Sequence, residues 1–172
     1  MRVIVGITGA SGSIYAVSLL RELLSRGVEV YGVCSRTGKE VMRVECGVGM
    51  SDFPLVNWFE PDDMFALIAS GSFFTDAMAI APCSMNTLSC VAFGISNNLL
   101  QRAAAVMLKE SRKLIIVPRE TPLSIIQLDA MLKLAKAGAT ILPATPGFYK
   151  QPKSIQDLVN FITERIIKQM NF

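Results

Sequence analysis

A glycine-rich turn near the start of the chain constrains the fold more than any other feature of the sequence. It follows residues 3–7, a short apolar segment rich in β-branched side chains and typical of a buried strand. It precedes residues 14–24, whose apolar side chains recur at helical spacing along one face. A second strand over residues 28–34 and a helix capped by Ser35 follow, and this β-α-β-α order predicts a parallel sheet covered by helices.

The rest of the chain continues this alternation of strands and helices. We expect strands over residues 77–81, 114–117 and 139–142, the first two ended by Pro82 and Pro118, and a short strand within 55–59. Helices are expected from Ser84 to Gly94 and over 97–109, 123–136 and 154–169, with loops at 69–72 and 143–153. No repeat or linker interrupts the sequence. We therefore predict one domain over residues 1–172, an α/β, three-layer, Rossmann-like or flavodoxin-like fold with a doubly wound parallel sheet.

The composition is apolar for a protein of this size. Hydrophobic residues make up 51% of the chain and charged residues 18%. No apolar run reaches the roughly 20 residues of a membrane-spanning helix, and the first residues lack the pattern of a signal peptide. We expect a cytoplasmic protein without a membrane partner, whose excess apolar surface is buried between copies of the chain. A net charge of +3 without a dense basic stripe argues against nucleic-acid binding.

The sequence contains no histidine, and its four cysteines form no CxxC pair. A structural metal site and a disulfide framework are therefore not expected. Acid–base chemistry has to use carboxylates, lysine, tyrosine, cysteine or the substrate itself.

The turn Gly9-Ala10-Ser11-Gly12 is a candidate phosphate site. Backbone N–H groups between a strand and a helix N-terminus favour an anion. The GxxG spacing matches neither the dinucleotide motif nor the P-loop, and Ser35 stands where an acidic residue would bind the ribose of NAD. A mononucleotide is therefore favoured over NAD as the ligand. An equal alternative is that these residues form a plain tight turn that binds no ligand.

A second candidate follows the strand 77–81. Ser84, Asn86 and Thr87 could hydrogen-bond a flavin ring or its ribityl chain at a strand end. The simpler alternative is that Ser84 only caps the next helix. Cys83 is expected to be a packed small residue rather than a nucleophile.

Charged residues supply two further candidates. Arg119 and Glu120 directly follow a strand, and we expect them to be functional, whereas Arg112 and Lys113 read as a solvated surface. Glu45 lies between apolar neighbours, a setting that can raise the pKa of a carboxyl group, although an ordinary exposed glutamate is the commoner case.

Tyr149 lies in a Pro-Gly loop and could cover a pocket with its hydroxyl on a phosphate, together with Arg165 of the last helix. The alternative is that Tyr149 only anchors the loop.

Six segments together resemble the flavin prenyltransferase family, the UbiX-type proteins. In the family's order they are GITGASG (6–12), ASGSF (69–73), APCSM (81–85), LKE (108–110), VPRETPL (117–123) and PGFY (146–149). The PRETPL and ASGSF segments are much more specific than the glycine turn.

The resemblance implies a reaction as well as a Rossmann-like fold. A dimethylallyl group passes from dimethylallyl phosphate to N5 and C6 of reduced FMN, and inorganic phosphate leaves. The product, prenylated FMN, serves a partner UbiD-type decarboxylase. The resemblance also implies a homododecamer and no metal, and the preferred donor, monophosphate or pyrophosphate, stays open.

The site residues implied by the resemblance fall into three groups. The contacts to FMN are Gly9, Ala10, Ser11, Ser35, Ser84, Met85, Asn86, Thr87 and Arg119. The groups around the dimethylallyl phosphate are Arg102, Lys109, Glu120, Tyr149 and Arg165. The acid–base set is Ser11, Glu45 and Glu120.

The chain departs from the family pattern at Ala105, where aspartate is usual, at Gln127, where histidine is common, and in lacking a C-terminal extension. Two other functions compete. A flavin-dependent cysteine decarboxylase of the phosphopantothenoylcysteine type would need a histidine near the flavin, and a non-catalytic FMN carrier would need no second phosphate site.

Overall fold

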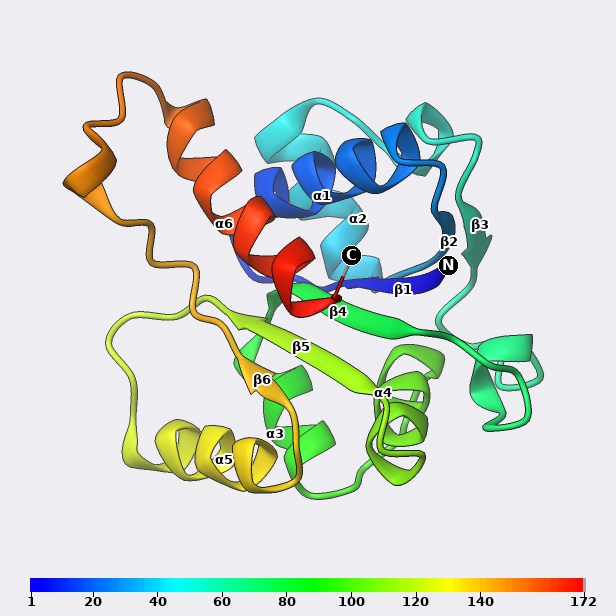
Figure 1. Cartoon of the computed structure of the whole chain (residues 1–172). Coiled ribbons are helices and arrows are strands. Elements are labelled where there is room, and N and C mark those ends of the chain that lie inside the picture. Colours follow the sequence, from blue (N-terminus) through cyan, green and yellow to red (C-terminus); the bar gives the residue numbers. More distant parts are fainter. Residues whose placement is uncertain (172) are drawn as a thin grey trace.

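A twisted sheet of six parallel strands runs through the middle of the molecule (Figure 1). The computed structural model describes residues 1–171. The strands are β1 (Arg2–Ile7), β2 (Glu29–Cys34), β3 (Asn57–Phe59), β4 (Ala77–Cys83), β5 (Lys113–Pro118) and β6 (Thr140–Ile141). Their order is β3-β2-β1-β4-β5-β6. This is the strand order of a doubly wound Rossmann sheet, so the predicted fold class is confirmed.

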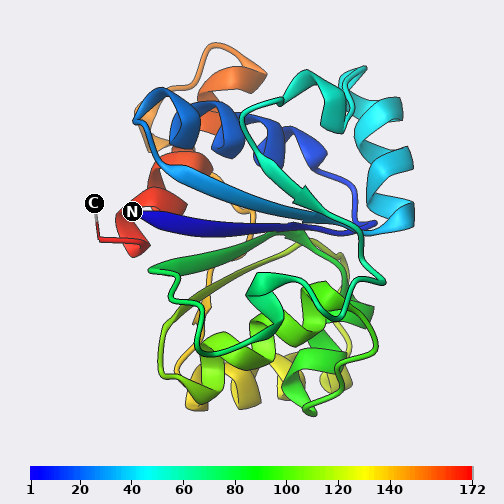
Figure 2. The same ribbon diagram turned by 90° about the vertical axis from the view of Figure 1, so that its right-hand side faces the viewer.

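Three helices cover each face of the sheet, which gives the predicted three layers (Figures 1 and 2). One layer holds α1 (Ser13–Ser25), α2 (Arg36–Cys46) and α6 (Ile155–Gln169). The other holds α3 (Met85–Ala92), α4 (Leu99–Lys109) and α5 (Ile125–Lys136). Short 3-10 helices lie at η1 (Met50–Asp52), η2 (Leu67–Ala69) and η3 (Phe148–Lys150). Two separate clusters of buried apolar side chains, one on each face of the sheet, join the helices to the strands.

Strand β4 differs from the expectation that Pro82 ends it. The strand continues through Pro82 to Cys83, which pairs with Pro118 after a register shift. Proline gives no N–H to a sheet, so it is tolerated where the ladder is irregular. Its carbonyl oxygen is used instead, because it accepts hydrogen bonds from the backbone N–H and the hydroxyl of Thr8.

The helix starts follow from capping side chains. Asn98 and Ser124 each accept a hydrogen bond from a backbone N–H three residues later, so α4 and α5 each begin two residues after the expected points. Ser154 caps α6 in the same way. The loop expected at 143–153 contains η3, and β6 is shorter than expected.

Large apolar side chains are exposed in several places on the layer of α3, α4 and α5. Two of these places are the outer face of α5 and the segment around η2 before β4. Their members are Ile125, Ile126, Leu128 and Leu132 in the first, and Met64, Phe65, Leu67 and Phe74 in the second. Within residues 1–171 no helix has the length and apolar character needed to cross a membrane.

Candidate functional site

The candidate site lies at the carboxyl ends of four neighbouring strands, β2, β1, β4 and β5. Thr8 follows β1 and joins two of them, since its buried hydroxyl donates to the Pro82 carbonyl (2.7 Å) and accepts from the Ser84 N–H (2.7 Å). Chain connections leave β1 and β4 in opposite directions, which makes this the switch point where doubly wound sheets bind ligands. Thr8 was not among the predicted site residues, although its place directly after a strand was visible in the sequence.

The glycine turn offers donors for an anion. Within residues 1–171, no acceptor takes the backbone N–H groups of Gly9, Ala10 or Ser11. A Cβ on Gly9 would lie 2.5 Å from the Thr37 side chain, so only glycine lets the turn approach α2 this closely. Three consecutive free donors on a close-packed turn suit a phosphate group.

The N-terminus of α1 is already neutralised by the chain itself. Oε2 of Glu45, near the end of α2, accepts hydrogen bonds from the N–H groups of Gly12 (2.9 Å) and Ser13 (2.9 Å). Gly12 adopts φ +104°, a left-handed conformation that suits glycine. An external anion at this turn would therefore bind the backbone N–H groups of the residues that precede Gly12.

Of the two alternatives for Glu45, the raised pKa is not what the structure supports. Partial burial raises the pKa, but the Ser11 hydroxyl, the N–H groups of Gly12 and Ser13, and the charge of Arg119 together hold it below the ordinary value. The exposed alternative describes the side chain better. Glu45 is therefore a hydrogen-bond acceptor for the glycine turn and the N-terminus of α1 in the free protein.

Arg119 ties the glycine turn to the end of β5. Its Nε donates to the Ser11 carbonyl (3.2 Å), and its backbone N–H donates to the Cys83 carbonyl (3.3 Å). Cys83 is fully buried, and burial raises the pKa of its thiol, which confirms the expectation of a packed residue.

The segment after β4 adopts the capping arrangement that was the simpler alternative. Ser84 accepts from the Thr87 N–H (3.4 Å) and donates to the Thr87 hydroxyl (3.2 Å). Asn86 is exposed and Met85 is half-buried at this first turn of α3. Ser35 caps α2 through the N–H of Gly38 (3.0 Å).

A cavity of about 310 Å³ lies beyond the ends of β5 and β6. Arg119 and Glu120 form part of its wall, with an Oε1 atom of Glu120 accepting from the Thr121 N–H (3.0 Å). The other lining residues are Pro118, Thr121, Leu123, Met131, Pro143, Ala144 and Thr145. The cavity thus places a cation and a carboxylate side by side next to the glycine turn.

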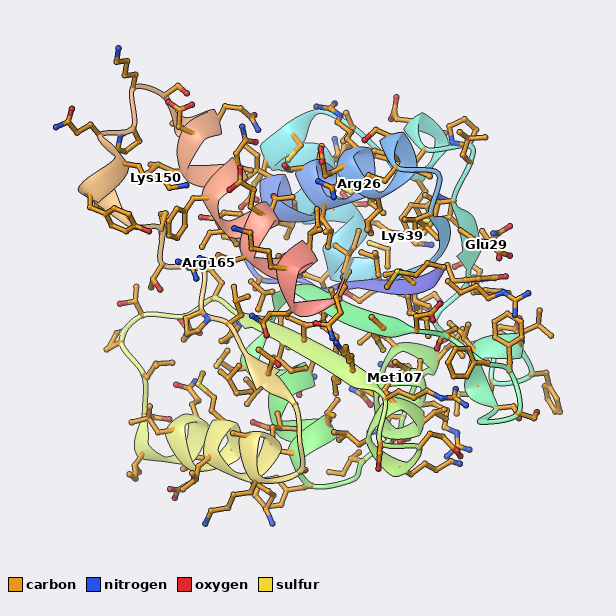
Figure 3. All side chains as sticks on the ribbon, in the orientation of Figure 1. Arg26, Glu29, Lys39, Met107, Lys150 and Arg165 are labelled. Atoms are coloured by element: carbon orange, nitrogen blue, oxygen red, sulfur yellow. The ribbon has the colours of Figure 1, made fainter. Side chains whose placement is uncertain are left out.

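Tyr149 and Arg165 meet at the aromatic ring of Phe161. The Tyr149 ring lies 6.0 Å from that of Phe161 at an angle of 81°, and the Arg165 guanidinium lies 5.4 Å from the Phe161 centroid. Figure 3 shows Arg165 pointing from α6 toward the segment that follows β6, and this side chain shares a cavity wall with Pro143 and Thr145. Phe161 was not predicted, because its role depends on a loop that the helix pattern does not reveal.

Arg102 and Lys109 do not join this group within one chain. Both lie on α4, in the layer opposite α6 (Figure 1). Nε of Arg102 donates to the Ala69 carbonyl (2.9 Å), and Lys109 forms an ion pair with Glu110. Within one chain, these two cations therefore lie apart from Tyr149 and Arg165.

Arg112 also departs from its expected role as a solvated charge. It is half-buried and donates to the carbonyls of Gly71 (2.6 Å) and Phe73 (3.0 Å), with its guanidinium 5.0 Å from the ring of Phe74. Together with Arg102 it fastens the ASGSF segment to α4. Sequence spacing carried no sign of this contact, because the acceptors are backbone carbonyls about 40 residues away.

In the part of the chain that the structure describes, no three His, Cys, Asp or Glu side chains cluster in a way that could hold a metal ion.

The fold and the strand-end groups define a doubly wound α/β protein with an anion-binding turn at its switch point. Residues 1–167 match the model of the Flavoprotein family. Flavin prenyltransferase LpdB of Lactiplantibacillus plantarum is 50% identical over 96% of this chain and 90% of its own length. The chain therefore belongs to the flavin prenyltransferase family of flavoproteins.

Two solved structures resemble the chain closely. A dodecameric FMN-dependent UbiX-like decarboxylase from Escherichia coli O157:H7 is 40% identical, with a TM-score of 0.97 over 100% of this chain and 96% of that one. AnUbiX (PadA1) in complex with FMN and dimethylallyl pyrophosphate is 38% identical, with a TM-score of 0.97 over 99% of this chain and 92% of that one.

Proposed function

We propose that this protein transfers a dimethylallyl group from a dimethylallyl phosphate donor to N5 and C6 of reduced FMN, releasing inorganic phosphate. The prenylated FMN then passes to a UbiD-type decarboxylase. The observation that carries the proposal is the free N–H donors of Gly9, Ala10 and Ser11 at a switch point in a chain of this family. The complex of AnUbiX with FMN and dimethylallyl pyrophosphate supports the pairing of FMN with a dimethylallyl donor.

The residues at the switch point fit FMN. The N–H groups of the turn and the nearby guanidinium of Arg119 suit a phosphate dianion. Ser35 and the segment from Ser84 to Thr87 supply hydroxyl and amide groups for the ribityl chain and the ring. Reduced flavin supplies the nucleophilic ring atoms, and the chain's own groups hold it in place and exclude water.

The donor site needs cations and a proton donor for the leaving phosphate. Tyr149 and Arg165 supply a hydroxyl and a charge on one chain. We assign Glu120, whose cavity shares Pro143 and Thr145 with the cavity at Arg165, as the donor of that proton. Glu45, ionised and hydrogen-bonded to Ser11, is assigned to accept a proton at the flavin.

We place Arg102 and Lys109 in the donor site of a neighbouring copy, since they lie across the sheet from Arg165 in their own chain. A homododecamer is supported by the dodecameric E. coli relative and by the two exposed apolar areas. The cysteines, all free in the described chain, fit the reducing cytoplasm.

The two competing functions have less support. The chain has no histidine for a cysteine decarboxylase mechanism. An FMN carrier gives no reason for Arg165 and Glu120 to line two cavities that share Pro143 and Thr145.

The test is an anaerobic incubation of the protein with reduced FMN and dimethylallyl phosphate, followed by the mass of the flavin and an assay for phosphate. We expect a heavier flavin and one phosphate released per flavin modified. A parallel reaction with dimethylallyl pyrophosphate distinguishes the two donors. An unchanged flavin mass with both donors, despite bound FMN, would leave the carrier function standing.

A further inference from the structure

Thr8 is a buried residue at the junction of the two central strands, and it has no role in the proposed chemistry. It directly follows β1 and is only 1% exposed. Its hydroxyl donates to the Pro82 carbonyl (2.7 Å) and accepts from the Ser84 N–H (2.7 Å). Both hydrogen bonds cross from the end of β1 to the end of β4, so one side chain ties the two strand ends together.

The backbone by itself makes only half of this junction. The ladder between β1 and β4 has its last pair at Gly6 and Ile80. Beyond that pair the Thr8 N–H reaches the Pro82 carbonyl at 3.3 Å, but proline has no N–H with which to return a bond. The Thr8 hydroxyl supplies the remaining contacts, because a hydroxyl can donate and accept at the same time.

A second bridge completes a ring of contacts around the switch point. The Arg119 N–H donates to the Cys83 carbonyl (3.3 Å), and its Nε donates to the Ser11 carbonyl (3.2 Å). Ser11 lies three residues after Thr8, and Cys83 directly precedes Ser84. The ends of β1, β4 and β5 are thus joined in a ring, in which Thr8 is the link between β1 and β4.

Thr8 also stands between the two halves of the proposed FMN site. It is followed directly by the turn 9–11, whose N–H groups have no acceptor in the described chain. Across the junction it holds the N–H of Ser84, the residue that caps α3 and begins the segment 84–87. A ligand that contacts both segments needs them at a fixed separation, and a buried hydroxyl with both hydrogen bonds made holds that separation.

We propose that Thr8 is a positioning residue for FMN, whose hydroxyl fixes the segment 84–87 relative to the glycine turn. This inference rests on the proposed function, which places both segments on one flavin nucleotide. Thr8 acts through its hydrogen bonds and does not itself contact the flavin. A site that is ordered before binding loses less entropy on association, so the hydroxyl contributes to FMN affinity from beneath the site.

Thr8→Val tests this, because it keeps the branched shape of the side chain but removes the hydroxyl. The Ser84 N–H is then left without its acceptor, so we expect the dissociation constant of FMN, measured by flavin fluorescence, to rise about tenfold. Hydrogen exchange should become faster over residues 84–88. The KM for the prenyl donor at saturating FMN should stay within about twofold of wild type. Thr8→Ser keeps the hydroxyl and should restore FMN binding.

Thr75→Val is the matched control. Thr75 is also a buried threonine, 2% exposed, but it precedes the opposite end of β4, and its hydroxyl donates to the sulfur of Met107 (3.3 Å). Its valine variant should bind FMN as wild type does, even where some stability is lost. An equal fall in FMN affinity in both valine variants would overturn the inference, because a general loss of stability would then explain both.

Thr8→Ala covers the case of a valine variant that fails to fold, since it removes the hydroxyl without placing a methyl group in its position. It should show the same rise in the FMN dissociation constant. Wild-type FMN affinity in either folded variant, or weaker binding with unchanged exchange over residues 84–88, would overturn the inference. The proposed function fails separately, if the wild-type protein binds FMN but forms no prenylated flavin.

Discussion

Oε2 of Glu45 lies 2.9 Å from the backbone nitrogen of Ser13, so a side chain near the end of α2 caps the first turn of α1. The contact joins two helices of one layer through a charge at a helix N-terminus, where a carboxylate is stabilising. It also holds the glycine turn in shape before any ligand arrives.

Replacing Glu45 with glutamine tests both consequences of this contact. Glu45→Gln keeps an acceptor oxygen but removes the charge, so we expect the free energy of unfolding in urea to fall by about 0.5–1 kcal/mol. FMN binding should persist, while prenylation of the flavin should slow at least tenfold if the carboxylate receives a proton. Unimpaired turnover would remove Glu45 from the proposed chemistry and leave it a structural cap.

The same carboxylate gives a pH dependence with a defined sign. The folded pKa of Glu45 lies below its ordinary value of 4.5, so the folded protein favours the ionised form. Its contribution to stability is complete above that ordinary value and is lost as the pH falls through the folded pKa. The difference in unfolding free energy between wild type and Glu45→Gln should therefore be constant near neutrality and shrink below pH 4.5. A difference that grows on acidification would contradict the assigned hydrogen bonds.

Arg112 should matter for the order of the ASGSF segment. Arg112→Lys keeps the charge but cannot donate to the carbonyls of Gly71 and Phe73 in the same geometry, so about 1–2 kcal/mol of stability should be lost. Hydrogen exchange should become faster in residues 69–74 and stay unchanged in β1. Lys136→Ala, on the exposed end of α5, serves as the control. Equal exchange in both variants would show that Arg112 does not hold the segment.

A mixing experiment tests whether two copies build one donor site. Lys109→Ala and Arg165→Gln should each be inactive alone. In oligomers assembled from equal amounts of both, about a quarter of the sites would draw an intact Lys109 from one chain and an intact Arg165 from another. Recovery of roughly that share of wild-type turnover is expected, and no recovery would place the two residues in the same site of one chain or in no site at all.

Local patterns were enough to predict most of the fold. Ser84 caps α3 through a contact within three residues, and Ser154 does the same at the expected start of α6, which a sequence displays directly. The strands of a covered parallel sheet are nearly continuous apolar runs, as β4 illustrates with every residue buried.

The contacts that the sequence could not reveal join distant parts of the chain. Glu45 binds a turn 33 residues away, and its hydrogen bonds reverse the pKa shift that its apolar neighbours suggest. Arg112 looks like a surface charge until the carbonyls of residues 71 and 73 are brought against it. The sequence resemblance assigns both Arg102 and Arg165 to one phosphate, and only their positions on opposite helix layers, α4 and α6, show that they lie apart within one chain.

That separation of Arg102 from Arg165 sets an order of events for a newly made chain. On leaving the ribosome, a lone chain already has its nucleotide turn but would bring only one of the three cations proposed for the donor, Arg165, to that site. Under the proposed function, alkylation would then wait for assembly, and its onset would depend on protein concentration as well as on folding. A reactive allylic donor would accordingly meet a complete set of charges only inside the finished particle.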